Sequence, residues 1–535
     1  MVSYPTAQNT AYNTFGGIRL RNGIERNGKM TAIICQNIDF EPQGISSNLK
    51  ITSSLGNVFV AKYPDYKLIK GWETVQDGTS YCIIYAENTT GGVLLKYENE
   101  IFTELATGLT KTGEANGITM VDTQYDVFVF TNGINYRKVC FAQTPQVATL
   151  TPIYNGENVT GLALAEQDGS LVIGSPKGFV IASRKGDITD WDYVNPSDNN
   201  KAWYQTFGKP VTAVVPYIRG LLVFTPDDST ILLGNFSNAS LASRASASLG
   251  GCMSFESWVL HDKYLFFYDN NQKNVYYFRQ NDYGQTQLGE PIAVDVQKFF
   301  IDVKRLQFIS YIANNKNEIW VLTDKNVLIF DYFAKEWSER VCQKINSYFQ
   351  FDKMLYSLSD DSLLREKEGL PGVFNGVFYP SVYTTQTITF GSYSNLKEME
   401  LPPILTVSSS RTNKFWIDAL IDDKKSKSKF LETKIISEDT ATFYAYVRNP
   451  IKGNYWSDSK GEYVYPDNST GIIIKKAKFP PEYASGRTNQ LKGKLIPNYY
   501  TVRFTFRTDN EGQVFSICSF ELKGISQETD TTGHK

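Results

Sequence analysis

Histidine is scarce in this sequence, which has only two histidines among 535 residues. His534 stands next to the last residue, so a histidine-based metal site or a Ser–His catalytic pair would have to use His261. We expect His261 to have a structural role in a turn at a strand edge. The zinc-protease motif HExxH, the Walker A loop, the nucleophile elbow GxSxG and the dinucleotide motif GxGxxG are absent. The sequence therefore predicts no catalytic residues, no cofactor and no metal, and we expect the chain not to be an enzyme.

Paired cysteines and long apolar runs are also missing. The six cysteines form no CxxC pair, which argues against a zinc ribbon or a thioredoxin-type site, and we expect them to be small core residues and not disulfides. No run of roughly 18 apolar residues could span a membrane, and the first residues lack the basic and apolar regions of a signal peptide. The cysteines are Cys35, Cys82, Cys140, Cys252, Cys342 and Cys518.

Charge of one sign is not in excess, since 54 basic and 56 acidic residues give a formal net charge of −2. The chain as a whole therefore has no basic field that would hold nucleic acid tightly. The one lysine-rich run, Lys424–Lys429, is interpreted as a solvated loop tip, with a phosphate contact as the alternative.

Aromatic residues and glycine are abundant. The sequence contains 33 tyrosines, 33 phenylalanines and 39 glycines but only 6 methionines, a balance that favours sheets and tight turns over helices. With 41% hydrophobic residues the chain can fill a substantial core. These counts predict an all-β protein.

One pattern recurs along the first two thirds of the chain: an apolar strand, a short polar break and a second apolar strand, as in a β-hairpin. The repeats begin about 45 residues apart on average, which is the length of one four-stranded blade of a β-propeller. Each hairpin would supply the two middle strands of a blade. The seven hairpins begin at Tyr81, Asp126, Ser170, Leu221, Tyr264, Glu318 and Met354.

The repeat predicts a degenerate β-propeller of six or seven blades. The segment Ser53–Val75 is a candidate for closing the ring with the last hairpin. Asp331 and Trp337 follow the hairpin that begins at Glu318. We expect Asp331 to cap a turn and Trp337 to fill the wedge between neighbouring blades, with a chemical role for Asp331 as the alternative.

The pattern of residues changes after about residue 380, where a new set of strands begins. The segment 498–524 alternates apolar and polar residues, with Val502, Phe504 and Phe506 on one face, and predicts a hairpin. We expect an extended N-terminal arm with the first strands at 1–50, the β-propeller at 51–380, a β-sandwich-like domain at 381–526 and a disordered tail at 527–535. Residues 446–471 have the composition of a long aromatic-rich loop.

The order of these features resembles the tail nozzle proteins (also called tail stabilisation or muzzle proteins) of short-tailed double-stranded DNA bacteriophages. The resemblance rests on the arm, on "VIGSPKGFVIASRKGDITDWDYVN" and "GLLVFTPDDSTILLGNFSNA" at the centre of the propeller, and on the closing "VRFTFRTDNEGQVFSICSFELKG". The resemblance extends over about residues 15 to 526. It rests on the order of the segments and on their residue patterns more than on invariant motifs. The aromatic loop at 446–471 departs from the family pattern.

The resemblance implies a structural virion protein that is made in the host cytoplasm and forms a homohexameric ring at the distal end of the tail. DNA would leave through the lumen without sequence-specific binding, and adaptor or ring proteins and fibres or a plug would be the neighbours. Aromatic and basic residues of the arm and of the aromatic loop are the predicted subunit or partner contacts, with packing onto their own domain as the alternative. These residues are Tyr4, Tyr12, Phe15, Arg19, Arg21, Tyr455, Trp456, Tyr463 and Tyr465.

Two other functions remain open at the level of sequence. A propeller could act as an adhesin or carbohydrate-binding protein, with aromatics such as Trp203, Tyr204 and Trp258 at the mouth of its channel. A propeller glycoside hydrolase built on a pair of carboxylates is the second alternative, since aspartate and glutamate are plentiful.

Overall fold

A computed structural model shows an all-β chain that divides into two compact units. The propeller unit comprises Val58–Val327 and Cys342–Glu366, and the sandwich unit comprises Met1–Asn57, Leu328–Val341 and Lys367–Lys535. The structure describes residues 8–20, 29–43, 48–194, 201–217, 220–236, 240–245, 250–280, 286–313, 316–389, 397–399, 404–408, 413–422, 424–425, 429–437, 440–447, 455–456, 463–464, 488–492 and 501–527.

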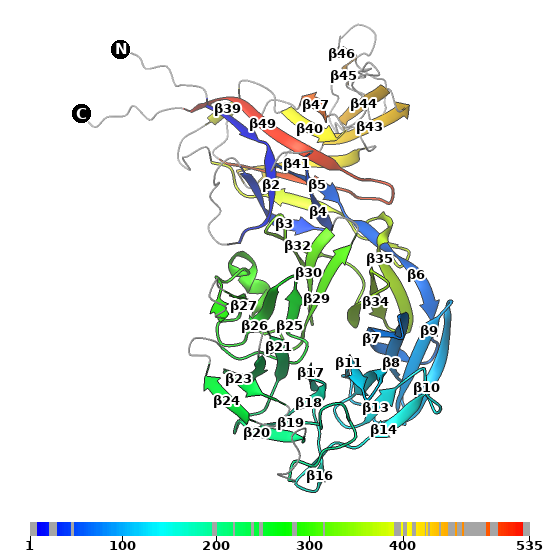
Figure 1. The fold of residues 1–535 in the computed structure, drawn as a ribbon. Helices are drawn as coiled ribbons and strands as arrows, with labels where there is room; N and C mark the ends of the chain where they lie inside the picture. The colour runs from blue at the N-terminus through cyan, green and yellow to red at the C-terminus, as the bar shows by residue number, and fades with distance from the viewer. Residues whose placement is uncertain are drawn as a thin grey trace, which may run out of the picture. The chain divides into compact units, whose positions relative to one another are not determined.

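Five consecutive blades of the propeller unit are antiparallel sheets of four strands in chain order (Figure 1). Each blade follows from an alternation of apolar strands and tight polar turns. The strands are β7 (Lys67–Gln76), β8 (Thr79–Glu87), β9 (Gly92–Glu98) and β10 (Ile101–Leu109) in blade 1; β11 (Asn116–Asp122), β12 (Tyr125–Thr131), β13 (Tyr136–Val139) and β14 (Val147–Leu150) in blade 2; β17 (Ala163–Gln167), β18 (Ser170–Ser175), β19 (Phe179–Ala182) and β20 (Trp203–Thr206) in blade 3; β21 (Ala213–Tyr217), β22 (Gly220–Phe224), β23 (Ser229–Asn235) and β24 (Ser240–Ala245) in blade 4; and β25 (Trp258–His261), β26 (Tyr264–Asp269), β27 (Asn274–Gln280) and β28 (Thr286–Leu288) in blade 5.

Two further blades complete the set. Blade 7 is a sheet whose fourth strand comes from the start of the chain: its strand order is β33, β34, β35 and then β6. The four strands numbered β29 to β32, which pair in chain order at the start of a larger sheet, make blade 6. The bounds are β29 (Leu306–Ala313), β30 (Lys316–Thr323), β31 (Val327–Asp331), β32 (Glu336–Arg340), β33 (Ser347–Phe351), β34 (Met354–Ser359), β35 (Ser362–Pro371) and β6 (Leu55–Lys62).

The first strands of neighbouring blades lie side by side and close into a ring. Strand β7 lies beside β11, β11 beside β17, β17 beside β21, β25 beside β29, β29 beside β33, and β33 beside β7, and blades 4 and 5 share one buried cluster. The propeller therefore has seven blades, and the seven hairpins predicted from the sequence are the middle strands of these blades. Type I′ geometry at Asp77–Gly78 (φ 48° and 76°) and Asp168–Gly169 (φ 52° and 81°) shows why two of the turns use Asp-Gly.

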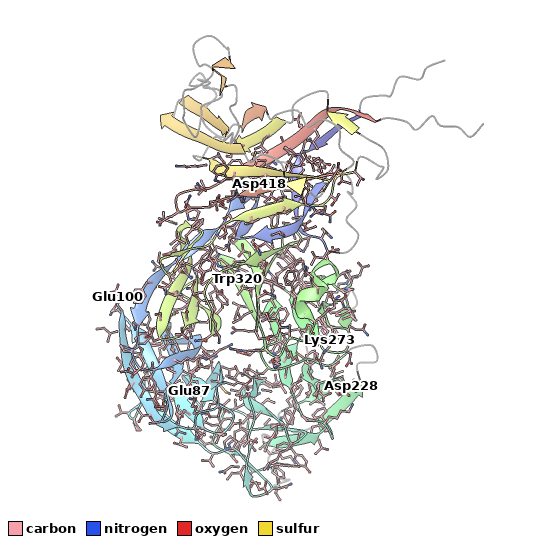
Figure 2. The ribbon with its side chains drawn as sticks, turned by 180° about the vertical axis from the view of Figure 1, so that it is seen from behind. Glu87, Glu100, Asp228, Lys273, Trp320 and Asp418 are labelled. Atoms are coloured by element: carbon pink, nitrogen blue, oxygen red, sulfur yellow. The ribbon has the colours of Figure 1, made fainter. Side chains whose placement is uncertain are left out.

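Apolar side chains from facing blades fill the space between them (Figure 2). At the seam where the ring closes, Ala61 of β6 lies in one buried cluster with Leu358 and Leu363 of blade 7 and with Ile84 of blade 1. The backbone N–H of Tyr63 also donates to the carbonyl oxygen of Asp361 at 2.9 Å. The predicted closure of the ring by Ser53–Val75 is confirmed, because β6 joins the last blade and β7 opens the first.

The sandwich unit contains two sheets whose aromatic faces meet. The Phe520 ring lies 4.7 Å from that of Phe504 and 5.7 Å from that of Phe506, so β49 packs across β48. The first sheet has the order β4 (Ile38–Pro42), β5 (Leu49–Ser53), β49 (Ser516–Gln527), β40 (Ile404–Ser408) and β47 (Thr488–Lys492), with β1 (Gln8–Tyr12) and β39 (Lys397–Met399) on β49; the second has the order β32, β3 (Lys29–Gln36), β38 (Val382–Thr385), β48 (Val502–Arg507), β41 (Lys414–Ile421), β43 (Lys429–Ser437) and β44 (Thr440–Val447), with β2 (Thr14–Ile18) on β3 and β42 (Lys424–Lys425) on β41.

The expected hairpin at 498–524 is wrong in its pairing. Strands β48 and β49 belong to different sheets and meet face to face, although Val502, Phe504 and Phe506 do share the buried face as predicted. An alternating pattern specifies one apolar face, but it does not say whether the next strand pairs edge to edge or packs across the core.

The expected N-terminal arm also differs from the structure. Strands β1 to β5 belong to the two sheets of the sandwich unit, in which β1 pairs with β49 and β2 runs parallel to β3. The described part of residues 1–50 is thus sheet, and the chain up to Asn57 belongs with the C-terminal segment instead of forming a separate region. The expected disordered tail lies outside the described residues, apart from Gln527, which ends β49.

The remaining elements are short. Asp331 caps its turn as predicted, since its carboxylate accepts the backbone N–H of Ala334 at 2.7 Å, and Trp337 packs on Phe330 of the same hairpin with ring centroids 5.0 Å apart. The short elements are β15 (Ile153–Tyr154), β16 (Glu157–Asn158), the 3₁₀ helix η1 (Val294–Phe300), β36 (Val373–Phe374), β37 (Val377–Phe378), β45 (Tyr455–Trp456) and β46 (Tyr463–Val464). None of the described helices is long and apolar enough to cross a membrane.

Candidate functional site

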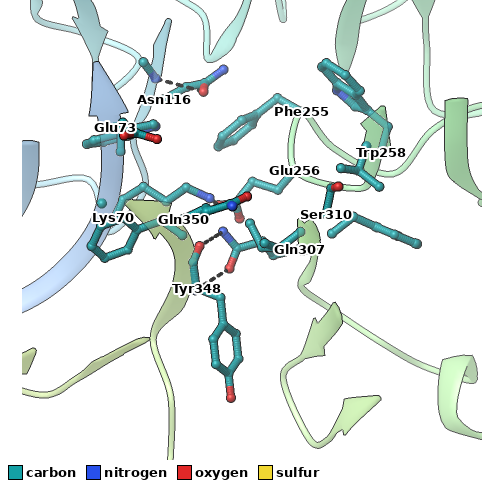
Figure 3. A pocket seen from close by; sticks show the side chains of 17 residues that line it. Lys70, Glu73, Asn116, Phe255, Glu256, Trp258, Gln307, Ser310, Tyr348 and Gln350 are labelled. Carbon is teal, nitrogen blue, oxygen red and sulfur yellow. Dashed lines mark hydrogen bonds and ion pairs between the residues drawn. The ribbon is translucent and has the colours of Figure 1, made fainter. Parts of the chain in front are cut away.

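A cavity of about 350 Å³ lies inside the propeller unit. Its lining comes from the first strands of blades 1, 2, 5, 6 and 7 or from the residues just before them (Figure 3). The lining mixes aromatic side chains with amides and charges. Residues labelled in Figure 3 are Lys70, Glu73, Asn116, Phe255, Glu256, Trp258, Gln307, Ser310, Tyr348 and Gln350.

Three charged side chains meet at this cavity. The carboxylate of Glu256, just before β25, pairs with the amine of Lys70 on β7, and its other oxygen lies 3.4 Å from Nε of Arg305. Only 10% of the Lys70 side chain and 8% of the Glu256 side chain are exposed, against 35% for Arg305. Lys70 belongs to blade 1 and Glu256 to blade 5, and these blades are not neighbours in the ring. The Lys70–Glu256 pair therefore bridges the channel of the propeller.

The charges of this group control one another's protonation. Burial would by itself raise the pKa of Glu256, but the positive charges of Lys70 and Arg305 outweigh it, and the pKa lies below the ordinary carboxyl value. Burial lowers the pKa of Lys70, an effect that the Glu256 carboxylate partly offsets. Both directions express the same balance between desolvation and Coulomb attraction.

Polar side chains also join neighbouring blades around the cavity. The Gln307 amide on β29 donates to the Ser347 hydroxyl and to the Tyr348 carbonyl, each at 3.1 Å, and accepts the Tyr348 N–H at 3.1 Å. Its hydrogen-bonding groups are thus all satisfied within the wall. The side chain holds blades 6 and 7 together and leaves little capacity for a ligand.

His261 is fully buried and bonded on both ring nitrogens. Its Nδ1 lies 2.8 Å from the Ser310 hydroxyl, and its Nε2 contacts the amide oxygen of Asn317. Since an amide oxygen only accepts, Nε2 carries the proton and Nδ1 accepts from Ser310. The residue joins the end of β25 to β29 and β30, which agrees with the structural role predicted for it.

The ion group predicts a pH effect on stability. Because the folded-state pKa of Glu256 is depressed, the carboxylate stabilises the fold at pH values above its ordinary pKa, and this contribution is lost as the pH falls through the lowered value. We expect Glu256→Gln to lower the melting temperature most near pH 7. The difference from the wild type should shrink progressively below about pH 4. Thermal melts of both proteins from pH 7 to pH 3 measure it, and a difference that stays constant over this range would contradict the assignment.

The predicted contact residues fall into three groups. Tyr12 and Phe15 are buried, at 1% and 0% exposure, so the alternative of packing onto their own domain describes them. Arg19 is bonded to Glu336 within the sandwich unit, with 3.2 Å between the closest atoms. Tyr4, Arg21 and Tyr465 lie outside the described residues, and for Tyr455, Trp456 and Tyr463 only the backbone strands β45 and β46 are described.

Other predicted features have mixed outcomes. Of the aromatics considered for a channel mouth, Trp258 lines the cavity, Trp203 is buried at 2% exposure, and Tyr204 is 44% exposed on β20. Of the run Lys424–Lys429, the first two lysines form β42 and the last begins β43, while 426–428 lie outside the described residues. All six cysteines are free, and five are buried. Within the described ranges, no group of three or more His, Cys, Asp or Glu side chains is arranged to hold a metal ion.

Sequence reasoning missed the Lys70–Glu256 pair. The two residues are 186 positions apart, and neither stands in a motif. A lysine in the middle of the apolar strand 67–76 was the only local signal, because a charge at such a position needs a partner.

The strand order defines a seven-bladed β-propeller joined to a β-sandwich-like unit. No family model matches the sequence, and no curated relative was found. Solved structures with a similar fold include the extracellular domain of a one-component system from B. thetaiotaomicron, which is 11% identical with a TM-score of 0.40 over 88% of this chain and 64% of that one. The chain thus spans less than two thirds of that domain.

Two other solved structures match over a shorter part of the chain. YCF48 bound to a D1 peptide is 10% identical with a TM-score of 0.37, over 58% of this chain and 95% of that one. The computationally designed Ika8 protein is 12% identical with a TM-score of 0.34, over 57% of this chain and 98% of that one. Each is a likeness of fold alone.

Proposed function

We propose that the protein is a structural subunit of a phage tail nozzle, a homohexameric ring at the distal end of a short tail through which DNA is ejected. The observation that carries the proposal is the sequence resemblance to tail nozzle proteins over about residues 15 to 526. A β-propeller followed by a β-sandwich-like unit is the architecture that this resemblance implies, and it agrees with the observed strand order.

The closed ring of blades supports a load-bearing role. The first and last blades are joined by β6, so both ends of the repeat are tied into one core. A ring of subunits needs rigid building blocks, because a head-to-tail interface closes into a ring only at one fixed rotation.

The channel of the propeller constrains where DNA could pass. Lys70 and Glu256 bridge that channel, and the Gln307 amide is bonded into its wall. DNA would therefore use a lumen formed between subunits and not the centre of one propeller. A formal net charge of −2 suits a lumen through which DNA slides, because many phosphate contacts would retain it.

Microscopy of the purified full-length chain tests the proposal. We expect class averages from negative stain to show sixfold rings of one size with an open lumen, and native mass spectrometry to give six copies. Antibodies against the chain should label the tip of the tail on particles that contain it. A protein that is monomeric in solution and whose antibodies label no tail would overturn the proposal.

A further inference from the structure

Three tyrosine rings contact one another on the propeller unit. Tyr154 lies on β15, Tyr204 lies on β20, the outer strand of blade 3, and Tyr193 lies in the segment between β19 and β20. The ring centroids are 5.0 Å apart for Tyr154 and Tyr204, 4.9 Å for Tyr193 and Tyr204, and 5.7 Å for Tyr154 and Tyr193. We call these three residues the tyrosine platform; β16, which pairs with β15, and β20 mark its place in Figure 1.

Contacts with the propeller core and with a neighbouring turn hold the rings of the platform in place. The Tyr154 ring lies 4.4 Å from that of Phe179, which belongs to the core between blades 2 and 3. The Tyr193 hydroxyl donates to the amide oxygen of Asn155 at 2.7 Å and accepts the Asn155 backbone N–H at 3.3 Å. Asn155 and Gly156 form the tight turn between β15 and β16, with φ of 49° and 78°. A ligand would therefore meet rings that are already in place, which reduces the entropy lost on binding.

The platform is only partly exposed. Tyr204 is 44% exposed, and the Tyr154 and Tyr193 rings that it contacts are half-buried against the core between blades 2 and 3. Single exposed apolar residues are ordinary on protein surfaces, but here one exposed ring continues into two further rings, which is a feature of binding sites.

The charged groups near the platform include two ion pairs and the exposed carboxylate of Asp192, which accepts the Val194 N–H at 2.9 Å. Lys177 bonds Glu157 of the β15–β16 hairpin at 2.8 Å, and Arg184 lies 3.5 Å from Asp190, three residues before Tyr193. A polyanion such as single-stranded nucleic acid needs a basic groove beside its stacking rings, and these ion pairs supply no net positive charge.

We propose that the tyrosine platform binds neutral oligosaccharide. A sugar ring has an apolar C–H face that can stack on a tyrosine ring, and hydroxyls that can bond to phenol oxygens and to the Asn155 amide. Tyrosine presents this combination, an apolar body with a polar tip, on a surface without net positive charge. The inference is independent of the nozzle proposal, because it concerns only the surface of blade 3 and the hairpin beside it.

A glycan array printed with neutral and acidic bacterial oligosaccharides, probed with the fluorescently labelled full-length protein, tests the inference. We expect binding to neutral glycans, and the affinity for the strongest of them, measured by calorimetry, should fall about tenfold or more in Tyr204→Ala. Tyr204→Phe keeps the ring and should remain within a few fold of the wild type. Phe59→Ala removes another exposed aromatic of the propeller unit, 54% exposed on β6, and should bind like the wild type.

Three results would overturn the inference: no binding to any printed glycan, binding to acidic glycans alone, or unchanged affinity in Tyr204→Ala. Melting temperatures within 2 °C of the wild type, on the order of the smallest shift that about 1 kcal/mol produces, establish that the variants are folded. Loss of glycan binding with intact rings in negative stain would separate this site from the assembly proposed above.

Discussion

Replacing Glu256 by alanine should lower the free energy of unfolding of the propeller unit by about 3–5 kcal/mol. The substitution leaves the amine of Lys70 buried without its partner, whereas the guanidinium of Arg305 is one-third exposed and can be solvated. The bridged blades, 1 and 5, should be loosened most. Urea denaturation gives the overall loss, and hydrogen exchange read by mass spectrometry should place it in β7 and in the segment around Glu256.

A double variant separates the ion pair from mere loss of packing. Lys70→Met together with Glu256→Met removes both buried charges and keeps side chains of similar length, so much of the lost stability should return. Lys209→Met removes a surface lysine, 51% exposed and bonded to Asp227, and should change stability by no more than about 1 kcal/mol. If the double variant is as unstable as the sum of its single variants, the two charges do not interact as the structure shows.

Replacing Phe520 by alanine should cost the sandwich unit about 3–5 kcal/mol. The side chain is 2% exposed and meets Phe504 edge-on at 4.7 Å and Phe506 at 5.7 Å, so its removal leaves a cavity between the two sheets. Thermal unfolding with near-ultraviolet circular dichroism detects the loss, since the aromatic contacts contribute to that signal.

A graded control accompanies this substitution. Phe520→Leu retains most of the apolar volume and should cost clearly less than the alanine variant. Phe333 is 74% exposed in the same unit, so Phe333→Ala should stay within about 0.5 kcal/mol of the wild type. Equal losses in Phe520→Ala and Phe333→Ala would mean that β48 and β49 do not pack face to face.

Local patterning predicted the repeating part of the fold well. Each of the seven hairpins supplies the two middle strands of a blade. A strand buried on both faces appears in the sequence as a short apolar run, and polar turns separate such runs, so the hairpins could be recognised. Asp331 could be assigned to its turn for a similar reason, as its carboxylate bonds an amide only three residues away. Interactions within one hairpin leave a local signature, and such signatures can be read from the sequence.

Pairings between distant segments could not be predicted in the same way. The strands at residues 8–53 have the composition of ordinary strands, and nothing in them says that their partners are β49 and β38. The pattern of β48 likewise fixes its buried face but not whether β49 pairs with its edge or covers that face. The Lys70–Glu256 pair joins residues 186 positions apart, and no periodicity relates them.

By itself the sequence determined that the chain is all-β, that its first two thirds repeat a four-stranded module, and that its closing strand buries alternate aromatic residues. The tertiary structure decided the count of seven blades, the closure of the ring by β6, the assignment of the N-terminal strands to the sandwich unit and the position of the tyrosine platform. The physical reason is that turn geometry and side-chain alternation act over a few residues. Sheet partners, buried ion pairs and surface clusters depend instead on which distant segments the burial of apolar surface brings together.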